Sequence, residues 1–74
     1  MEKLYNITDE KFKEAKNLIR KNGGAIYTDD TFSIKGVEGK FEKQDNLLKI
    51  IITDKPFFAP WSMIEKKIDE FFKQ

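Results

Sequence analysis

The chain has 74 residues, of which 14 are basic and 13 acidic, and it contains neither cysteine nor histidine. This length predicts a single domain, residues 1–74, with a thin core that buries roughly 60% of the unfolded surface. Without cysteine and histidine, disulfides are excluded and a structural zinc site is strongly disfavoured. The nearly balanced charge argues against nucleic-acid binding. We therefore expect no cofactor, no metal and no nucleic-acid partner.

The composition also bears on where the protein resides. A small chain without a disulfide framework fits a reducing compartment. The sequence contains no signal-peptide pattern and no apolar run long enough to cross a membrane. We therefore expect a cytoplasmic protein with no transmembrane segment.

The first predicted helix spans Asp9 to Lys21. Thr8 is placed to cap its N-terminus, and Ile7 is placed to pack on Phe12, one turn into the helix. The apolar residues that follow recur at helical spacing: Phe12, Ala15, Leu18 and Ile19. Asn22-Gly23-Gly24 should end the helix, because glycine readily adopts the left-handed conformation that closes a helix.

Residues 25–35 then alternate in the manner of a short hairpin, with a turn at Asp29-Asp30. Phe32 and Ile34 occupy even positions, whereas the apolar residues of the next strand occupy odd ones. This change of parity requires a turn or a bulge, which Gly36 permits. The sequence predicts one more strand at about Glu38–Lys43.

The run Leu47–Thr53 is the most strand-prone part of the chain and is predicted to be a central strand. Pro56 ends it. A second helix follows, and it begins either at the capping-box spacing Ser62–Glu65 or earlier, with Pro60 at its first position. Its apolar stripe contains Trp61, Ile64, Ile68, Phe71 and Phe72.

These elements predict an α+β fold: a helix, an antiparallel β-meander and a C-terminal helix, with both helices on one face of the sheet. The meander has four strands, or three if residues 31–43 form one bent strand, and Leu4 and Tyr5 are candidates for an additional edge strand. The expected core consists of Phe12, Ile19, Phe41, Ile50, Ile52, Ile64 and Ile68.

The chain offers little catalytic chemistry. Acid–base and covalent catalysis at neutral pH usually depend on histidine, cysteine, an activated serine or lysine, or carboxylates with unusual pKa values. Ser33 and Ser62 have structural explanations in a strand and at a helix start. Asp29 and Asp30 supply too few oxygens for a calcium site. We therefore expect that the protein is not an enzyme and has no catalytic residues.

A candidate apolar contact surface is formed by Leu47, Ile51, Phe57, Phe58 and Trp61. With alternate residues of the central strand turned toward the helices, Leu47 and Ile51 should lie on the uncovered face of the sheet. If the aromatic residues joined them, the patch would be larger than monomers usually expose, and would indicate self-association, a protein partner or an apolar ligand. The alternative is that the aromatic residues close the end of the sheet beneath the second helix.

Several segments resemble the small bacterial polyhydroxyalkanoic-acid system proteins, over about residues 9–73. They are Phe32-Ser33-Ile34-Lys35-Gly36, Gly39-Lys40-Phe41, Asp45-Asn46, Pro56-Phe57-Phe58-Ala59-Pro60-Trp61 and Ile64-Glu65-Lys66-Lys67-Ile68. The resemblance implies a helix before a β-meander and a closing helix after the proline-aromatic stretch. It also implies a cytoplasmic accessory protein linked with polyester storage granules, with no assigned catalytic residues.

The resulting expectation is a non-enzymatic accessory or binding domain that uses apolar surface. Its partner would be an apolar ligand, a polyester surface or a protein. The alternative is a homo-oligomerising interaction module without a ligand, for which a homodimer is the simplest form.

Overall fold

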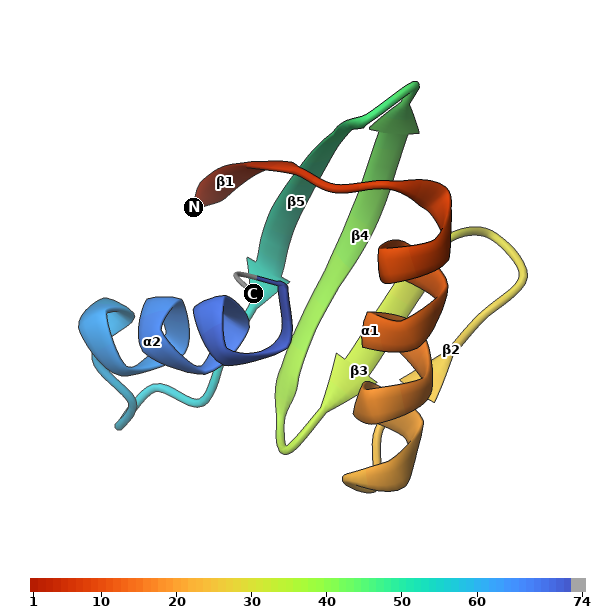
Figure 1. The fold of residues 1–74 in the computed structure, drawn as a ribbon. Coiled ribbons are helices and arrows are strands. Elements are labelled where there is room, and N and C mark those ends of the chain that lie inside the picture. Colours follow the sequence, from red (N-terminus) through yellow and green to blue (C-terminus); the bar gives the residue numbers. More distant parts are fainter. Residues whose placement is uncertain (73–74) are drawn as a thin grey trace.

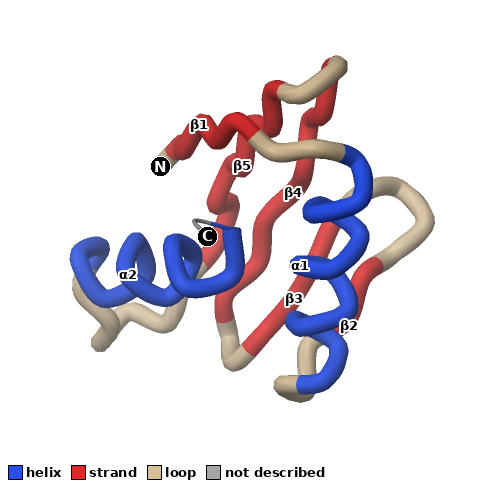
Figure 2. The backbone as a smooth tube through the Cα atoms, in the orientation of Figure 1, coloured by secondary structure: helices blue, strands red, loops and turns tan. Residues whose placement is uncertain are grey.

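The computed structural model describes residues 1–72, which form a five-stranded antiparallel sheet with two helices on one face (Figure 1). In chain order the elements are β1 (Glu2–Asn6), α1 (Asp9–Lys21), β2 (Ala25–Ile26), β3 (Thr31–Ile34), β4 (Val37–Gln44), β5 (Leu47–Asp54) and α2 (Trp61–Phe72). Across the sheet the strand order is β1-β5-β4-β3-β2, so the meander runs from β2 to β5 and β1 is added beside β5 (Figure 2). The predicted α+β fold is confirmed.

The sheet contains more strands than the meander of three or four that the sequence predicts. The candidate edge strand at Leu4 and Tyr5 is present as β1, so the described chain begins with a strand rather than a helix. Residues 31–43 form two strands and not one bent strand, because Lys35 and Gly36 adopt positive φ values of 50° and 83° and make a tight turn. The strand predicted from residue 25 is short and ends at Ile26.

Helix α1 has the predicted bounds. The hydroxyl of Thr8 accepts a hydrogen bond from the backbone N–H of Lys11 at 3.2 Å, as an N-cap residue does. Helix α2 begins at Trp61, and the carbonyl of Pro60 accepts from the backbone N–H of Ile64 at 3.3 Å. The first turn of α2 therefore starts from Pro60 rather than from Ser62.

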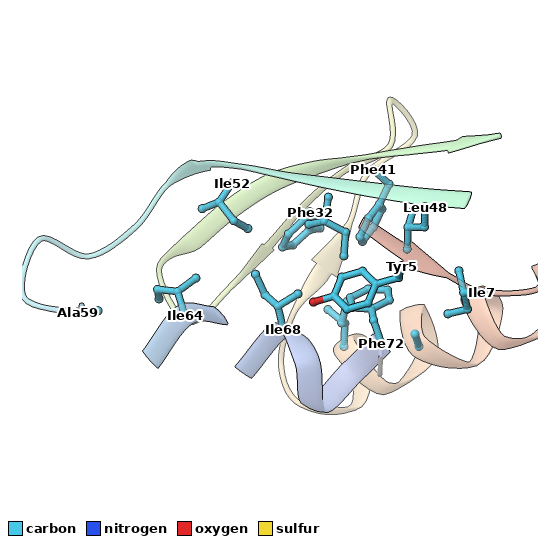
Figure 3. Packing of buried hydrophobic residues seen from close by; sticks show 13 residues of the cluster. Tyr5, Ile7, Phe32, Phe41, Leu48, Ile52, Ala59, Ile64, Ile68 and Phe72 are labelled. Atoms are coloured by element: carbon cyan, nitrogen blue, oxygen red, sulfur yellow. The ribbon is translucent and has the colours of Figure 1, made fainter. Parts of the chain in front are cut away.

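The core lies between the sheet and the helices, and aromatic rings form its centre (Figure 3). The ring of Phe41 on β4 stacks on Phe32 of β3 with centroids 4.7 Å apart. It also meets Phe12 of α1 edge-on at 5.2 Å and Phe72 of α2 at 5.7 Å. The predicted core residues are buried, except that Phe12 is only half-buried. One ring on β4 therefore contacts both helices.

Gly39 makes room for this stack. It pairs with Phe32 across the β3–β4 ladder, and a Cβ atom at this position would lie 2.8 Å from the Phe32 ring and 2.5 Å from the carbonyl oxygen of Ile51. Neither neighbour has free space to move, since one is backbone and the other is packed against Phe41. Glycine is therefore required here for steric reasons.

We expect Gly39→Ala to lower the free energy of unfolding by roughly 1–3 kcal/mol, the usual cost of overpacking a core. Urea denaturation measures the change. The neighbouring exposed residue Lys40 provides the control, because Lys40→Ala should shift stability by less than about 0.5 kcal/mol. Equal stability of wild type and Gly39→Ala would contradict the packing described for Phe32.

The two ends of the described chain are joined by polar contacts between β1 and α2. The hydroxyl of Tyr5 donates to the carboxylate of Asp69 at 2.6 Å, and the ammonium of Lys3 lies 3.2 Å from Glu65 and 3.7 Å from Asp69. The ring of Tyr5 also packs against Phe72, with centroids 5.7 Å apart. Burial of the phenol, together with its bond to Asp69, raises the pKa of Tyr5 well above its ordinary value.

This shift predicts a loss of stability in alkali. In the unfolded chain a tyrosine ionises near pH 10, whereas the folded protein keeps the phenol of Tyr5 neutral. The contribution of Tyr5 is therefore complete below about pH 10 and is lost as the pH rises further. We expect Tyr5→Phe to cost about 1–2 kcal/mol at neutral pH and less above about pH 10.5, as measured by thermal melts. If the difference in stability between the wild type and Tyr5→Phe did not change with pH, ionisation of Tyr5 would not be linked to folding.

Candidate functional site

A cavity of about 370 Å³ opens between α1 and α2, on the face of the sheet that the helices cover. We call it the apolar groove. The helices lie at a steep angle to one another, so they diverge and leave part of the sheet between them uncovered by helix (Figure 1). The floor of the groove is formed by Phe32 and Ile34 of β3 and by Val37 of β4, beside the β3–β4 turn.

The walls of the groove come from helix faces. Helix α1 contributes Leu18 near its C-terminal end. Helix α2 contributes Met63, Lys67 and Phe71, which recur every four residues and therefore form one stripe along the helix. Met63 is exposed and Phe71 is half-buried, so apolar side chains line the groove without filling it.

The loop between β5 and α2 closes one end of the groove through Pro56, Phe58 and Ala59. Pro56 packs closely on the β3–β4 turn, where a Cβ atom on Gly36 would lie 2.9 Å from its ring. The ammonium of Lys55 donates to the carbonyl of Ala59 at 2.7 Å, which holds the loop in a folded shape. This end of the groove is therefore built by local contacts.

Four polar side chains line the groove, and all four are exposed to solvent. They are Asn22, Lys35, Lys67 and Glu70. The amide of Asn22 is engaged at the end of α1, where it donates to the carbonyl of Leu18 at 2.8 Å, and Lys67 lies 3.6 Å from Glu70. An apolar interior with charged groups at its entrance suits an apolar chain that carries a polar end.

The lining of the groove includes no serine, threonine or tyrosine hydroxyl. Among residues 1–72, no three acidic side chains come together in a way that could hold a metal ion. Asp29, considered above as a cation ligand, lies in the loop between β2 and β3 and accepts from the hydroxyl of Thr31 at 2.6 Å. That bond, with a second from the backbone N–H of Thr31, lowers the pKa of Asp29. Its carboxylate therefore has a local structural role in this loop.

The structure places Leu47 and Ile51 away from the groove, on the face of the sheet opposite the helices, which we call the open face. Leu48, Ile50 and Ile52 point into the core and are buried, so their alternate neighbours point outward. Leu47 is exposed and Ile51 is half-buried. The prediction for the two faces of this strand is confirmed.

Phe57, Phe58 and Trp61 lie beyond the other end of β5. Phe57 is 94% exposed and Phe58 77% exposed, and their rings meet edge-on at 5.7 Å. Neither closes the end of the sheet, so that alternative is wrong for these two residues. Ala59 is the buried residue of this segment. The small methyl group is buried in the loop before α2, whereas the rings remain outside.

The five predicted contact residues therefore do not form one patch. Leu47 is separated from the end of β5 by most of the strand, ~23 Å at the usual rise per residue. Phe58 borders the groove on the helix side, whereas Ile51 lies on the open face. Of the predicted set, only Phe58 lines the groove. Of the other wall residues, Leu18 and Phe71 belong to the predicted helix stripes, which a buried core also requires, whereas Met63 and Lys67 belong to neither stripe.

Comparisons of the chain with protein-family models, with curated proteins and with solved structures found no match. The resemblance to polyhydroxyalkanoic-acid system proteins therefore stays a prediction, and its last residue, Lys73, lies outside the described residues. Within residues 1–72, neither helix has both the length and the apolar character that a membrane crossing needs.

The contrast between Phe58 and Ala59 is directly testable by thermal unfolding. Phe58→Ser removes an exposed ring and should change the free energy of unfolding by no more than about 0.5 kcal/mol. Ala59→Leu forces extra atoms into a buried position and should cost roughly 1–3 kcal/mol. If instead Phe58→Ser is the more damaging change, the loop packs differently from the arrangement described.

Proposed function

We propose that this protein is a non-enzymatic binding domain that takes an apolar chain, such as an acyl chain or a segment of aliphatic polyester, in the apolar groove. The observation that carries the proposal is the groove itself. Its volume of about 370 Å³ lies within the range of roughly 300–1,000 Å³ that is usual for small-molecule sites. Its lining is mostly apolar, and its four polar side chains are exposed to solvent.

The resemblance to polyhydroxyalkanoic-acid system proteins suggests the class of ligand. We propose an accessory role at cytoplasmic polyester granules, where an aliphatic polyester would be both the ligand and the surface. Phe58 and Phe57 support this role. Phe58 lines the groove and the ring of Phe57 meets it edge-on, so the two exposed rings add apolar contact area where a surface would approach. Lys35 in the lining would favour the carboxylate at the end of an acyl chain or polyester chain, whereas the charge of Lys67 is offset by Glu70.

Binding can be tested with sodium decanoate, below its micelle concentration, followed by amide NMR spectra. We expect the largest shifts around Leu18, Ile34 and Phe71, which line the groove. Phe58→Ser and Met63→Ser should each weaken binding about tenfold or more, because burying such a side chain contributes ~1.5–3 kcal/mol and 1.4 kcal/mol is a factor of ten. Both residues are exposed, so the folded state should tolerate the changes.

Leu47→Ser is the matched control. It removes an exposed aliphatic side chain from the open face and should leave decanoate binding unchanged. Adsorption of the same three variants to polyhydroxybutyrate particles is then measured. We expect Leu47→Ser to adsorb as the wild type does, and Phe58→Ser and Met63→Ser to adsorb more weakly. Loss of binding in Leu47→Ser alone would move the site to the open face, and no shift with decanoate at any concentration would refute the proposed function.

A further inference from the structure

Strand β1 is an edge strand whose hydrogen-bonding groups on one side are not used by the sheet. It lies at the end of the strand order, and within residues 1–72 no other strand pairs with its outer side. The carbonyl of Met1 accepts from the N–H of Ile52 at 2.9 Å, and the N–H of Ile7 donates to Asn46 at 2.8 Å, so the odd-numbered residues face β5. In an antiparallel ladder the backbone N–H and C=O groups of Glu2, Leu4 and Asn6 consequently point away from β5.

The two edges of the sheet differ. The opposite edge is β2, which has only two residues and offers little to pair with. Short edge strands are one of the ways in which proteins avoid association through sheet edges. β1 has five residues and lacks this protection. It is therefore the edge that can accept another strand.

The exposed aliphatic residues of the open face gather beside this same edge. Leu4 is 64% exposed and lies opposite Lys49 of β5, so Leu47 and Ile51 are its diagonal neighbours. On the next strand, β4, the residues that face the same way include Lys40 and Glu42, which form an ion pair at 3.5 Å. The apolar part of the open face thus ends at the unpaired edge and not in the middle of the sheet.

We propose that β1 pairs antiparallel with β1 of a second copy of this chain, with the two-fold axis at Leu4. The outward-pointing residues then form the hydrogen-bonded pairs, so that Leu4 lies opposite the partner's Leu4, and Glu2 lies opposite the partner's Asn6. On the helix side, Lys3 lies opposite the partner's Tyr5, whose hydroxyl is bonded to Asp69. This brings a cation toward an acidic group across the interface.

Other registers are less favourable. Shifting the pairing toward the N-terminus places Lys3 opposite the partner's Lys3, or Glu2 opposite the partner's Glu2, and like charges directly opposite one another are destabilising. Shifting it toward the C-terminus runs past Asn6, where β1 ends and the chain turns toward α1. The register centred on Leu4 uses the whole strand, and it joins the Leu4, Leu47 and Ile51 clusters of both copies into one apolar strip.

Single-cysteine variants test this register, because the chain has no cysteine of its own. In the proposed dimer the two Cα atoms at Leu4 are ~5.5 Å apart, within the range of about 4.4–6.8 Å that a disulfide spans. We expect Leu4→Cys to form a disulfide-linked dimer with oxidised glutathione, as seen by non-reducing electrophoresis. Glu2→Cys is the matched control, because its two copies would be ~13 Å apart and should remain monomeric on the gel. A mixture of Glu2→Cys with Asn6→Cys should cross-link.

Sedimentation velocity of the unmodified chain supplies the second test. We expect a dimer that dissociates on dilution, and Leu4→Pro should abolish it, because proline removes an N–H that β5 does not use. Leu4→Thr keeps this N–H and should still dimerise, and thermal melts establish that both variants are folded. If Leu4→Pro does not fold, the cysteine variants decide.

Equal cross-linking of Leu4→Cys and Glu2→Cys, or a wild type that is monomeric at every concentration, would overturn the proposal. Phe58→Ser should leave the dimer intact, which separates this interface from the groove.

Discussion

The contact of the Phe41 ring with both helices is the constraint on which the rest of the structure depends. Phe12 and Phe72 reach Phe41 from α1 and α2, and Phe32 stacks on it from the neighbouring strand. Phe72 then meets Tyr5, so the same group of rings extends to β1. Because the helices are joined at this point and run in different directions from it, they cannot also close over the β3–β4 turn. The groove is the space that this geometry leaves.

Local signals in the sequence were sufficient for much of this fold. The cap at Thr8 and the glycines after Asn22 predicted α1 at its observed bounds, and the parity change around Gly36 predicted the β3–β4 turn. Strand β1 was only a candidate, because a short segment containing Leu4 and Tyr5 carries no periodicity that separates an edge strand from a loop. Its conformation is stabilised by β5 and α2, which lie far away in the chain.

The groove could not be predicted, because its residues come from α1, β3, β4, the 55–60 loop and α2, and only their relative placement creates it. The segment Pro56–Trp61 shows what sequence alone could not predict. Composition indicated that Pro56–Trp61 was important, but nothing in the pattern identified which of its side chains is buried. Packing at the end of β5 leaves room for the methyl group of Ala59 and excludes the rings of Phe57 and Phe58. Which of these side chains is buried depends on the space available in the folded structure, not on hydrophobicity along the chain.

The position of Trp61 has a consequence for spectroscopy. The only indole of the chain is 46% exposed at the start of α2, and the ammonium of Lys55 lies 5.1 Å from its ring centroid. The same ammonium holds the carbonyl of Ala59. Intrinsic tryptophan fluorescence will therefore report the state of the loop at the end of the groove, whereas far-ultraviolet circular dichroism will report the sheet and the helices. Any difference between the two signals during denaturation would reveal that the loop opens before the sheet does.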